Sequence, residues 1–335
     1  MKVLITGGAG YIGSTIASAL EDEGHRPIIL DSLVTGRREF TSGRIFYPLD
    51  IADGEGVKTI FQEHPDIHAV IHCAAFIVVP ESVEEPYSYY ENNVVKSLSL
   101  FKTLDEVGCR RIVFSSSASI YDMVPDFMVT EEAPLKPSSP YARTKYMMEM
   151  ILKDLAAASS FRGIALRYFN PIGADPAMRS GIHVKEPSHV LGKLVDVALG
   201  KEPVFRITGT GWPTRDGSGI RDYIHVWDLA RAHVKAVTGF DEAFRRSGAE
   251  NYLVINLGSG KGVTVKELLT AFEKVWGSAL PKEEAPPRPG DVAGAYASAE
   301  KALNLLDWRA EMGMEEAIES ALRWGRERES RLSWD

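Results

Sequence analysis

The chain has 335 residues, of which 44% are hydrophobic and 25% charged, and 38 Lys and Arg against 46 Asp and Glu give a formal net charge of −8. This is an ordinary composition for a globular protein of about two domains, and the net negative charge argues against binding of a nucleic-acid backbone, which is mainly a cationic attraction. Two cysteines cannot form a disulfide scaffold, which favours a reducing cytoplasm, and apolar runs far short of the ~20 residues that cross a bilayer, with a strand directly after Met1-Lys2, predict neither a membrane span nor a signal peptide.

Strands and helices are expected to alternate along the first half of the chain. Short β-branched runs predict strands at residues 3–6, 27–31, 44–47, 69–73, 111–114 and 163–167. Apolar residues at helical spacing predict helices at residues 12–20, 57–61, 87–107 and 141–158. After residue 171 the pattern loosens, and helices are expected near residues 188–199, 228–238, 264–276 and 312–325.

Alternation of this kind implies right-handed βαβ crossovers. The predicted fold class is therefore α/β, with a Rossmann-type doubly wound parallel sheet over residues 1–170 and a smaller α/β C-terminal lobe over residues 171–335. The boundary is approximate, and we expect the chain to cross between the two lobes. The Pro-rich stretch 281–290 fits either a linker or a loop of the smaller lobe.

Three glycines follow the first predicted strand and open the first predicted helix. They have G-x-x-G-x-x-G spacing and are Gly7, Gly10 and Gly13. This spacing gives a tight turn, lets the backbone approach a pyrophosphate, and leaves helix N–H groups free to bind it, although an ordinary glycine turn can look the same. Asp31, at the end of the second predicted strand, favours NAD, because its carboxylate accepts ribose hydroxyls and repels a 2′-phosphate. A turn-starting Asp31 is the alternative, and Arg37 and Arg38 keep NADP open.

Of the twelve tyrosines, only Tyr141 has a lysine four residues further on, at Lys145. The pair opens a predicted helix, so the two side chains lie one turn apart on one face. The serines Ser115–Ser117 follow a predicted strand, at the sheet edge where open α/β folds bind ligands. A phenol, with a pKa near ~10, becomes a base near neutral pH if an ammonium and a cationic nicotinamide ring lower its pKa. The alternative is a helix-start tyrosine beside a solvated lysine.

Five motifs resemble the extended short-chain dehydrogenase/reductase family over essentially the whole chain, and within it the UDP-glucose (UDP-galactose) 4-epimerases. They are GGAGYIGS at 7–14, FSSSA at 114–118, YARTK at 141–145, LRYFNP at 166–171 and DGSGIRDYIHV at 216–226. The last two lie outside the cofactor motif and are the most specific. The resemblance implies an NAD-dependent isomerase that interconverts UDP-glucose and UDP-galactose. It would oxidise C4 to a 4-keto sugar with bound NAD, let the sugar rotate and return the hydride.

The resemblance also implies roles for single residues. Tyr141 would take the proton of the sugar 4-hydroxyl, Ser117 would hydrogen-bond that oxygen, and Lys145 would hold the nicotinamide ribose and lower the pKa of Tyr141. Implied cofactor contacts are Gly7, Gly10, Tyr11, Ile12, Gly13, Asp31, Ser32, Thr35, Gly36, Asp50, Ile51, Cys73, Ala74, Ala75, Ile77, Asn92, Ser115, Tyr141, Lys145 and Phe169. Implied substrate contacts are Ser117, Tyr141, Asn170, His189, Arg221, Arg288, Asp291 and Ala295.

Three positions depart from the family pattern. Ile77 stands where many epimerases have a lysine that reaches the cofactor phosphates, so we expect NAD to be held less tightly. Ser188-His189-Val190 replaces Asn-Asn-Leu at the substrate diphosphate; His189 could still donate there, or Ser188 could cap a helix beside a surface histidine. Ala295 stands where a large tyrosine tends to exclude N-acetylated sugars, so UDP-N-acetylglucosamine and UDP-N-acetylgalactosamine are expected substrates too, unless the adjacent Tyr296 is the true match.

Other functions remain open at this stage. A nucleotide-sugar 4,6-dehydratase would carry acids where Ala118 and Ser119 stand, while another nucleotide-sugar 4-epimerase, for UDP-glucuronate for example, is an alternative. A non-catalytic NAD sensor would be expected to lose Tyr141 or Lys145. No metal is expected, because no histidine pair has ligand spacing with supporting acids. Asp228 is expected to cap a helix.

The expected partners are a UDP-sugar and a second copy of the chain. Family members commonly dimerise through two long helices, which here would be residues 87–107 and 141–158. Their apolar side chains allow such a dimer, although core burial explains them equally well.

Overall fold

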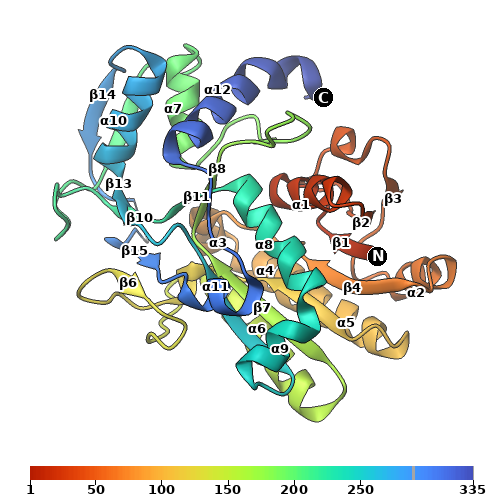
Figure 1. Ribbon diagram of the computed structural model, residues 1–335. Coiled ribbons are helices and arrows are strands. Elements are labelled where there is room, and N and C mark those ends of the chain that lie inside the picture. The colour runs from red at the N-terminus through yellow and green to blue at the C-terminus, as the bar shows by residue number, and fades with distance from the viewer. Residues whose placement is uncertain (289–290, 335) are drawn as a thin grey trace.

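The computed structural model describes residues 1–288 and 291–334. Its centre is a parallel seven-stranded sheet in the order β12-β7-β5-β4-β1-β2-β3 (Figure 1). The strands are β1 (Lys2–Thr6), β2 (Arg26–Leu30), β3 (Ile45–Tyr47), β4 (Ile67–His72), β5 (Arg111–Ser115), β7 (Arg162–Tyr168) and β12 (Tyr252–Leu257). The order confirms the predicted Rossmann-type α/β fold. The second half of the chain supplies its last strand, β12, which pairs with β7.

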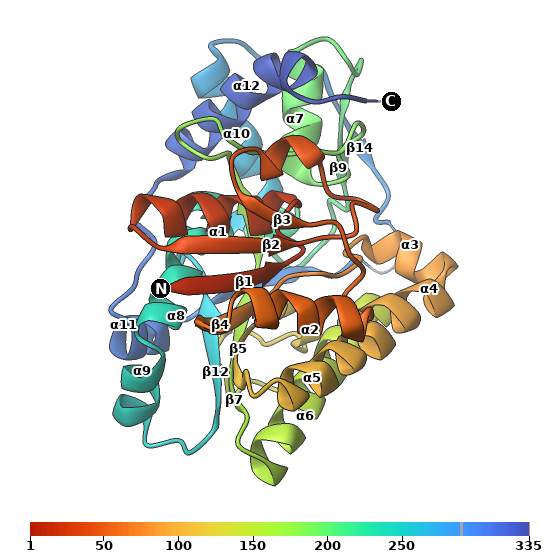
Figure 2. The same ribbon diagram turned by 90° about the vertical axis from the view of Figure 1, so that its right-hand side faces the viewer.

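Helices cover both faces of this sheet, because successive strand residues point to opposite sides. Val3 and Ile5 of β1 belong to one core and Leu4 to the other. The first core lies against α1 (Tyr11–Asp22), α8 (Val226–Thr238), α9 (Phe240–Ser247) and α11 (Glu300–Leu306). The second core lies against α2 (Gly54–Glu63), α5 (Lys96–Glu106) and α6 (Pro140–Ala158). Figure 2 shows α1 and α2 on opposite sides of the strands.

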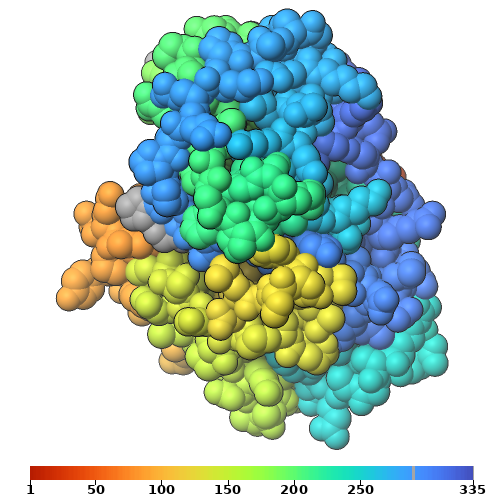
Figure 3. Space-filling view, turned by 90° about the vertical axis from the view of Figure 1, so that its left-hand side faces the viewer, coloured from red at the N-terminus to blue at the C-terminus, as the bar shows by residue number. Residues whose placement is uncertain are grey.

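A smaller lobe lies beyond one end of the strands. Three helices pack around its own core, which includes Leu194, Leu268 and Ile318; they are α7 (Val190–Ala198), α10 (Val265–Trp276) and α12 (Met314–Arg331). Short paired strands accompany them: β8 (Asn170–Ile172) with β11 (Tyr223–His225), β9 (Phe205–Thr208) with β14 (Lys282–Ala285), and the four-stranded set β13 (Val263–Thr264), β10 (Ile220–Arg221), β15 (Gly294–Ala297) and β6 (Met128–Val129). Figure 3 shows this lobe, in green and blue, meeting the sheet part, in orange to yellow.

The helix predicted at 87–107 is present and contains a π-helical turn. The structure has α3 (Val79–Glu84), α4 (Pro86–Tyr90), a π-helical turn at Glu91–Val95 and then α5. Such turns frequently lie at functional sites. Among the helices that the structure describes, none is long and apolar enough to cross a membrane.

The expectation that Asp228 caps a helix is wrong. His225 is the N-cap of α8, and its ring accepts the N–H of Trp227 at 3.0 Å. Asp228 lies in the first turn and is fully buried, where its carboxylate accepts the N–H groups of Glu311 at 2.9 Å and Met312 at 2.7 Å. It therefore ties α8 to the turn before α12.

Candidate functional site

The glycine turn follows β1 and lies against the loop that follows β4. The strand order reverses between these two strands. Gly7 has φ +71°, and a Cβ there would lie 2.7 Å from the backbone nitrogen of Ala74, while a Cβ on Gly13 would lie 2.2 Å from the carbonyl oxygen of Gly7. Gly10 is the N-cap of α1 and supplies no side-chain acceptor. The first N–H groups of α1, at Tyr11 and Ile12, are thus available to an anion such as a pyrophosphate.

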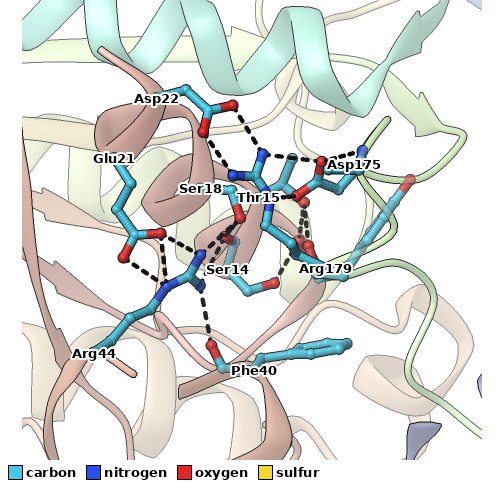
Figure 4. A network of polar contacts seen from close by, with 12 residues as sticks. Ser14, Thr15, Ser18, Glu21, Asp22, Phe40, Arg44, Asp175 and Arg179 are labelled. Carbon is cyan, nitrogen blue, oxygen red and sulfur yellow. Dashed lines mark hydrogen bonds and ion pairs between the residues drawn. The ribbon is translucent and has the colours of Figure 1, made fainter. Parts of the chain in front are cut away.

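Arginines from two loops hold this helix in place, as Figure 4 shows. Arg44 donates to Ser18 Oγ at 2.8 Å, on the buried polar face of α1. Arg179, from the loop after β8, pairs with Asp22 at the end of α1 and with the buried Asp175, both at 2.6 Å. The cofactor helix is therefore fixed to the loop that leads into the smaller lobe.

The carboxylate of Asp31 lies beside the glycine turn. It is 8% exposed and accepts the N–H groups of Ala9 at 3.0 Å and Leu33 at 2.8 Å. Burial raises the pKa of Asp31, and these two hydrogen bonds oppose that rise. An ionised carboxylate has about four acceptor positions, so it can also accept ribose hydroxyls. Gly36 lies directly against it, because a Cβ there would be 2.8 Å from Asp31 Oδ1.

The neighbouring loop presents its other predicted contacts to solvent, since Ser32 and Thr35 are exposed. Arg37 is engaged elsewhere. It donates from Nε to the carbonyl of His183 at 3.0 Å and from NH1 to that of Ser333 at 3.3 Å. Its guanidinium therefore already has acceptors within the chain, which disfavours the NADP alternative that Arg37 had kept open.

The loop after β4 carries four further predicted contacts. Cys73, Ala74 and Ala75 are half-buried, whereas Ile77 is exposed. On the far side of β1, Ile51 is buried and Asp50 pairs with Lys96 at 2.5 Å. These residues border the same edge of the sheet as the glycine turn.

A residue that the sequence analysis missed, Asn93, fixes the 73–77 loop. Its Oδ1 accepts the N–H of Phe76 at 2.8 Å, and its Nδ2 donates to the carbonyl of Phe76 at 2.9 Å. The predicted contact Asn92 only donates to Asn93, at 3.0 Å. The π-helical turn places both asparagines, and the paired Asn-Asn in the sequence was the available signal.

The serine, tyrosine and lysine come together at the carboxyl edge of β5. Lys145 donates to the carbonyl of Ser115 at 2.9 Å, and its Nζ lies 6.0 Å from the centre of the Tyr141 ring. Ser117 Oγ donates to Ser119 Oγ at 2.9 Å, and the Ser117 hydroxyl is close enough to Tyr141 to lower the pKa of the phenol. Lys145 and Tyr141 lie close together because they are four residues apart on α6. Ser115 and Ser117 reach them because β5 ends at this point.

Burial shifts the pKa values of both ionisable groups in this site. It lowers the pKa of Lys145 to about 8, against weaker opposing effects of Cys73 and Glu149. It raises the pKa of Tyr141, and the hydrogen bond with Ser117 lowers it in part. A tyrosine base here consequently needs additional positive charge beside it, which a cationic nicotinamide ring would supply.

Serine Ser115 also links the site to the interior. Its Oγ lies 3.0 Å from Cys73 Sγ and 3.0 Å from His233 Nε2 on α8. Burial raises the pKa of the Cys73 thiol to about 11 and lowers that of His233 to about 4. Both groups are therefore neutral near pH 7.

Three of the predicted substrate contacts, Arg221, Arg288 and Asp291, lie near one another. Arg221 donates to the carbonyls of Ile220 at 2.7 Å and Ala293 at 2.8 Å. Burial lowers the pKa of Arg221, while the charge of Asp291 raises it and the charge of Arg288 lowers it. Arg288 and Asp291 pair with each other at 3.2 Å. Phe169 and Asn170 are half-buried where β7 passes into β8.

Ala295 lies directly opposite Arg221 in the parallel pairing of β15 and β10. Aligned residues of paired strands share a face, and the next residue points the other way. Tyr296 does point the other way, because a Cβ on Gly262 would lie 2.6 Å from its ring. Ala295 rather than Tyr296 therefore shares the face of Arg221.

His189, and not Ser188, caps α7. Its Nδ1 accepts the N–H of Gly192 at 3.2 Å, which leaves the ring proton on Nε2. Burial, with Arg328 nearby, lowers the pKa of His189 to about 4. The ring lines a small cavity with Trp324 and Arg328, between α7 and α12, so the expected surface histidine is wrong. Among the residues described, no group of three or more His, Cys, Asp or Glu could hold a metal ion.

Known proteins of one family are similar to this chain over most of its length. Residues 3–257 match the model of the NAD dependent epimerase/dehydratase family. The UDP-glucose 4-epimerase of Bacillus subtilis is 41% identical over 334 residues, covering 97% of this chain and 96% of that protein.

Two crystal structures are similar over nearly the whole chain. UDP-glucose 4-epimerase from Bifidobacterium longum, in complex with NAD+ and UDP, is 34% identical with a TM-score of 0.92 and covers 99% of this chain and all 100% of its own. The enzyme from Stenotrophomonas maltophila, with bound NAD and formylated UDP-arabinopyranose, is 36% identical with a TM-score of 0.91 and covers 98% and 99%.

Proposed function

Since this chain belongs to the NAD dependent epimerase/dehydratase family, with the extended short-chain dehydrogenase/reductase fold, we propose that it is an NAD-dependent isomerase that interconverts UDP-glucose and UDP-galactose. The observation that carries the proposal is the grouping of Tyr141, Lys145 and Ser117 beside the open N-terminus of α1. Relatives named UDP-glucose 4-epimerase, and structures of such enzymes with NAD and UDP or a UDP-sugar bound, support it.

The residues of the chain fit NAD at the carboxyl edge of the sheet. The pyrophosphate would lie on the N–H groups of α1, and the adenosine ribose on Asp31. Lys145 would hold the nicotinamide ribose. When bound, NAD supplies the place to which the C4 hydride goes and from which it returns.

The proton chemistry belongs to the chain itself. Tyr141, as phenolate, would take the proton of the sugar 4-hydroxyl, and Ser117 would hold that oxygen in line with it. Lys145 provides the positive charge that favours the phenolate. The same tyrosine would return the proton after the sugar has turned over, so no net oxidation results.

The substrate is anchored at its diphosphate rather than at its sugar. Arg221 and Arg288 are the proposed contacts of the two phosphates. Arg221 now donates to backbone carbonyls and Arg288 pairs with Asp291, so each would exchange these acceptors for the diphosphate, and the released Asp291 would accept uridine ribose hydroxyls. Asn170 and His189 are further proposed contacts. An anchor remote from the reacting ring leaves the sugar free to rotate.

We also propose that N-acetylated UDP-hexoses are substrates. Ala295 shares the face of Arg221, and its methyl side chain leaves space beside the sugar that a tyrosine would fill. An acid for dehydration at C5 and C6 is lacking at Ala118 and Ser119, so the dehydratase alternative is disfavoured.

The proposed assembly is a cytoplasmic homodimer. Three exposed apolar side chains lie on the two long helices of the proposed interface: Val95 at the end of the π-helical turn, Leu98 on α5 and Met150 on α6. A two-fold interface built on these helices would cover them. Sedimentation of the purified protein would check the dimer.

The experiment that tests the function incubates purified protein with UDP-galactose and, separately, with UDP-galacturonate, without added NAD, and follows the products. Formation of UDP-glucose supports the proposal. A 4-keto-6-deoxy product would indicate a dehydratase instead, and turnover of UDP-galacturonate alone would indicate a different epimerase.

The control is Tyr141→Phe, which removes the proton acceptor and keeps the ring. We expect kcat to fall by about 10²–10⁴-fold with an unchanged melting temperature. Full activity of this variant would rule out the proposed proton transfer.

A further inference from the structure

A third ionisable side chain follows Tyr141 and Lys145 on the same face of α6. Glu149 is four residues beyond Lys145, so the three lie along one line of the helix. Its side chain is 4% exposed. The proposed proton transfer does not use this carboxylate, and a buried carboxylate requires partners of its own.

The partner is an arginine on β7. Arg167 donates from Nε to Glu149 Oε1 at 3.0 Å and from NH2 to Oε2 at 2.7 Å. This is a bidentate ion pair between two side chains that are both almost fully buried. The remaining nitrogen, NH1, donates to Tyr121 Oη at 2.9 Å, and Tyr121 donates to Asn256 at 2.7 Å. Contacts from three parts of the chain therefore fix the pair.

The same carboxylate reaches the catalytic segment. Ser116 Oγ donates to Glu149 Oε1. The residue before it, Ser115, accepts the Lys145 ammonium at its carbonyl, and the residue after it, Ser117, lies close enough to Tyr141 to lower the pKa of its phenol. Each serine of the run consequently lies beside one of the three aligned side chains of α6.

We propose that Glu149, locked by Arg167, is a positioning residue for the epimerisation: it fixes Ser116, between the Ser115 carbonyl that holds Lys145 and the Ser117 hydroxyl beside Tyr141, and it neutralises the buried charge of Arg167. This inference rests on the proposed function. It assigns to the buried ion pair a role in setting the pH range of the reaction.

The charges around the pair determine the sign of the effect. Glu149 favours the charged form of Lys145 and so raises its pKa, against burial, which lowers it to about 8. With Glu149 neutral, the Arg167 charge is no longer balanced. Positive charge favours both an uncharged lysine and a phenolate, so the pKa values of Lys145 and Tyr141 would both fall. The other titratable groups that face these side chains are His72, Cys73, Tyr89, Tyr121, Glu131, Tyr168 and Tyr252, and His233 faces the neighbouring Ser115.

The test compares Glu149→Gln with wild type and with Asp154→Asn, an exposed carboxylate on the same helix. The pH dependence of kcat is measured with UDP-galactose. We expect both limbs of the Glu149→Gln profile to move to lower pH by about one unit, and kcat at neutral pH to fall about tenfold with little change in KM. The Asp154→Asn profile should match wild type.

A merely structural role would lower kcat without moving either limb, and unmoved limbs in folded Glu149→Gln would overturn the proposal. If that variant does not fold, the double variant Glu149→Met/Arg167→Met removes both buried charges. It should keep the wild-type limbs but lose about tenfold in kcat, because Ser116 has lost its acceptor. A double variant with wild-type kcat would equally overturn the proposal.

A second readout separates this inference from the proposed function. The near-ultraviolet absorbance change of Tyr141 on titration is obtained as the difference between each protein and its Tyr141→Phe counterpart. Glu149→Gln should lower the midpoint by about one pH unit even in protein that turns over no UDP-sugar. An unchanged midpoint contradicts the role of Glu149, whereas a lowered midpoint without any turnover by wild type contradicts only the proposed function.

Discussion

We propose that one residue, Ala295, sets the substrate range of this site. Ala295 lies opposite Arg221, and Tyr296 points to the other side of β15. A tyrosine at position 295 would therefore occupy the face of Arg221, where we propose that the sugar binds. Tyr296 does not occupy that face, because its ring lies against Gly262.

We predict that Ala295→Tyr loses activity toward UDP-N-acetylgalactosamine by at least about tenfold, because the added ring would occupy the space left for the acetamido group. Activity toward UDP-galactose should change far less. The two values of kcat/KM, measured side by side, check this. Equal loss for both sugars would show that the substitution merely disturbs β15, and Tyr296→Phe serves as the control of matched position.

Some contacts of the site could be predicted from the sequence and others could not. The spacing of Tyr141 and Lys145 and the position of Ser115–Ser117 predict that these groups meet, and in the structure they do. Glu149 and Arg167 escape notice because 18 residues separate them, and only the packing of α6 on β7 makes them a pair. His189 illustrates the converse: a histidine can cap a helix as well as a serine can, and burial is not visible in the sequence.

Among the elements, the π-helical turn at Glu91–Val95 has the clearest consequence for the site. It places Asn93 so that its amide makes two hydrogen bonds to Phe76. The 73–77 loop, where Ile77 supplies no charge to a cofactor, thus depends on Asn93 for its shape.

We predict that Asn93→Leu weakens NAD binding by about tenfold or more, since two buried backbone groups of Phe76 lose their partners and each loss costs about 1–3 kcal/mol. The NAD content of the purified protein and the Kd for added NAD measure this. Ser99→Ala, on the exposed side of α5, is the matched control. Undiminished NAD content in Asn93→Leu would show that the loop holds its shape without this residue.

The elements also show why the sequence analysis went only part of the way. Short β-branched runs predict β1, β2, β3, β4, β5 and β7, and all six of these expected strands are present. The run YLVINL of β12 went unassigned, because a short apolar run in a loosely patterned region fits a buried helix segment equally well. The long helix predicted at 87–107 is present from Pro86 to Glu106, but its π-helical turn, which inserts an extra residue in the repeat, was not predicted.

For the molecule as a whole, buried histidines govern the response to acid. Burial lowers the pKa of four of them, His183, His189, His225 and His233, to about 4 and that of His72 to about 3. In the unfolded chain the ordinary value is near ~6.5. Between pH 6.5 and 4 the unfolded state therefore binds more protons, so the free energy of unfolding falls as the pH falls.

We predict that stability to urea drops markedly between pH 7 and pH 5, with at most about 2 kcal/mol lost per fully buried histidine. Urea midpoints at the two pH values measure it. His233→Asn should flatten the pH dependence relative to wild type. A midpoint independent of pH in wild type would contradict the prediction.

The division of the sheet between the two halves of the chain has a consequence for synthesis on the ribosome. After β7 has emerged, one face of the sheet still lacks α8, which begins at Val226, and β7 has no partner on its outer side until β12. About 60 residues, or roughly 3–12 seconds at usual translation rates, separate β7 from α8. Throughout that interval the nascent chain presents an apolar surface and an open strand edge, the features that chaperones bind, so the yield of native protein will depend on holding that intermediate until its second half arrives.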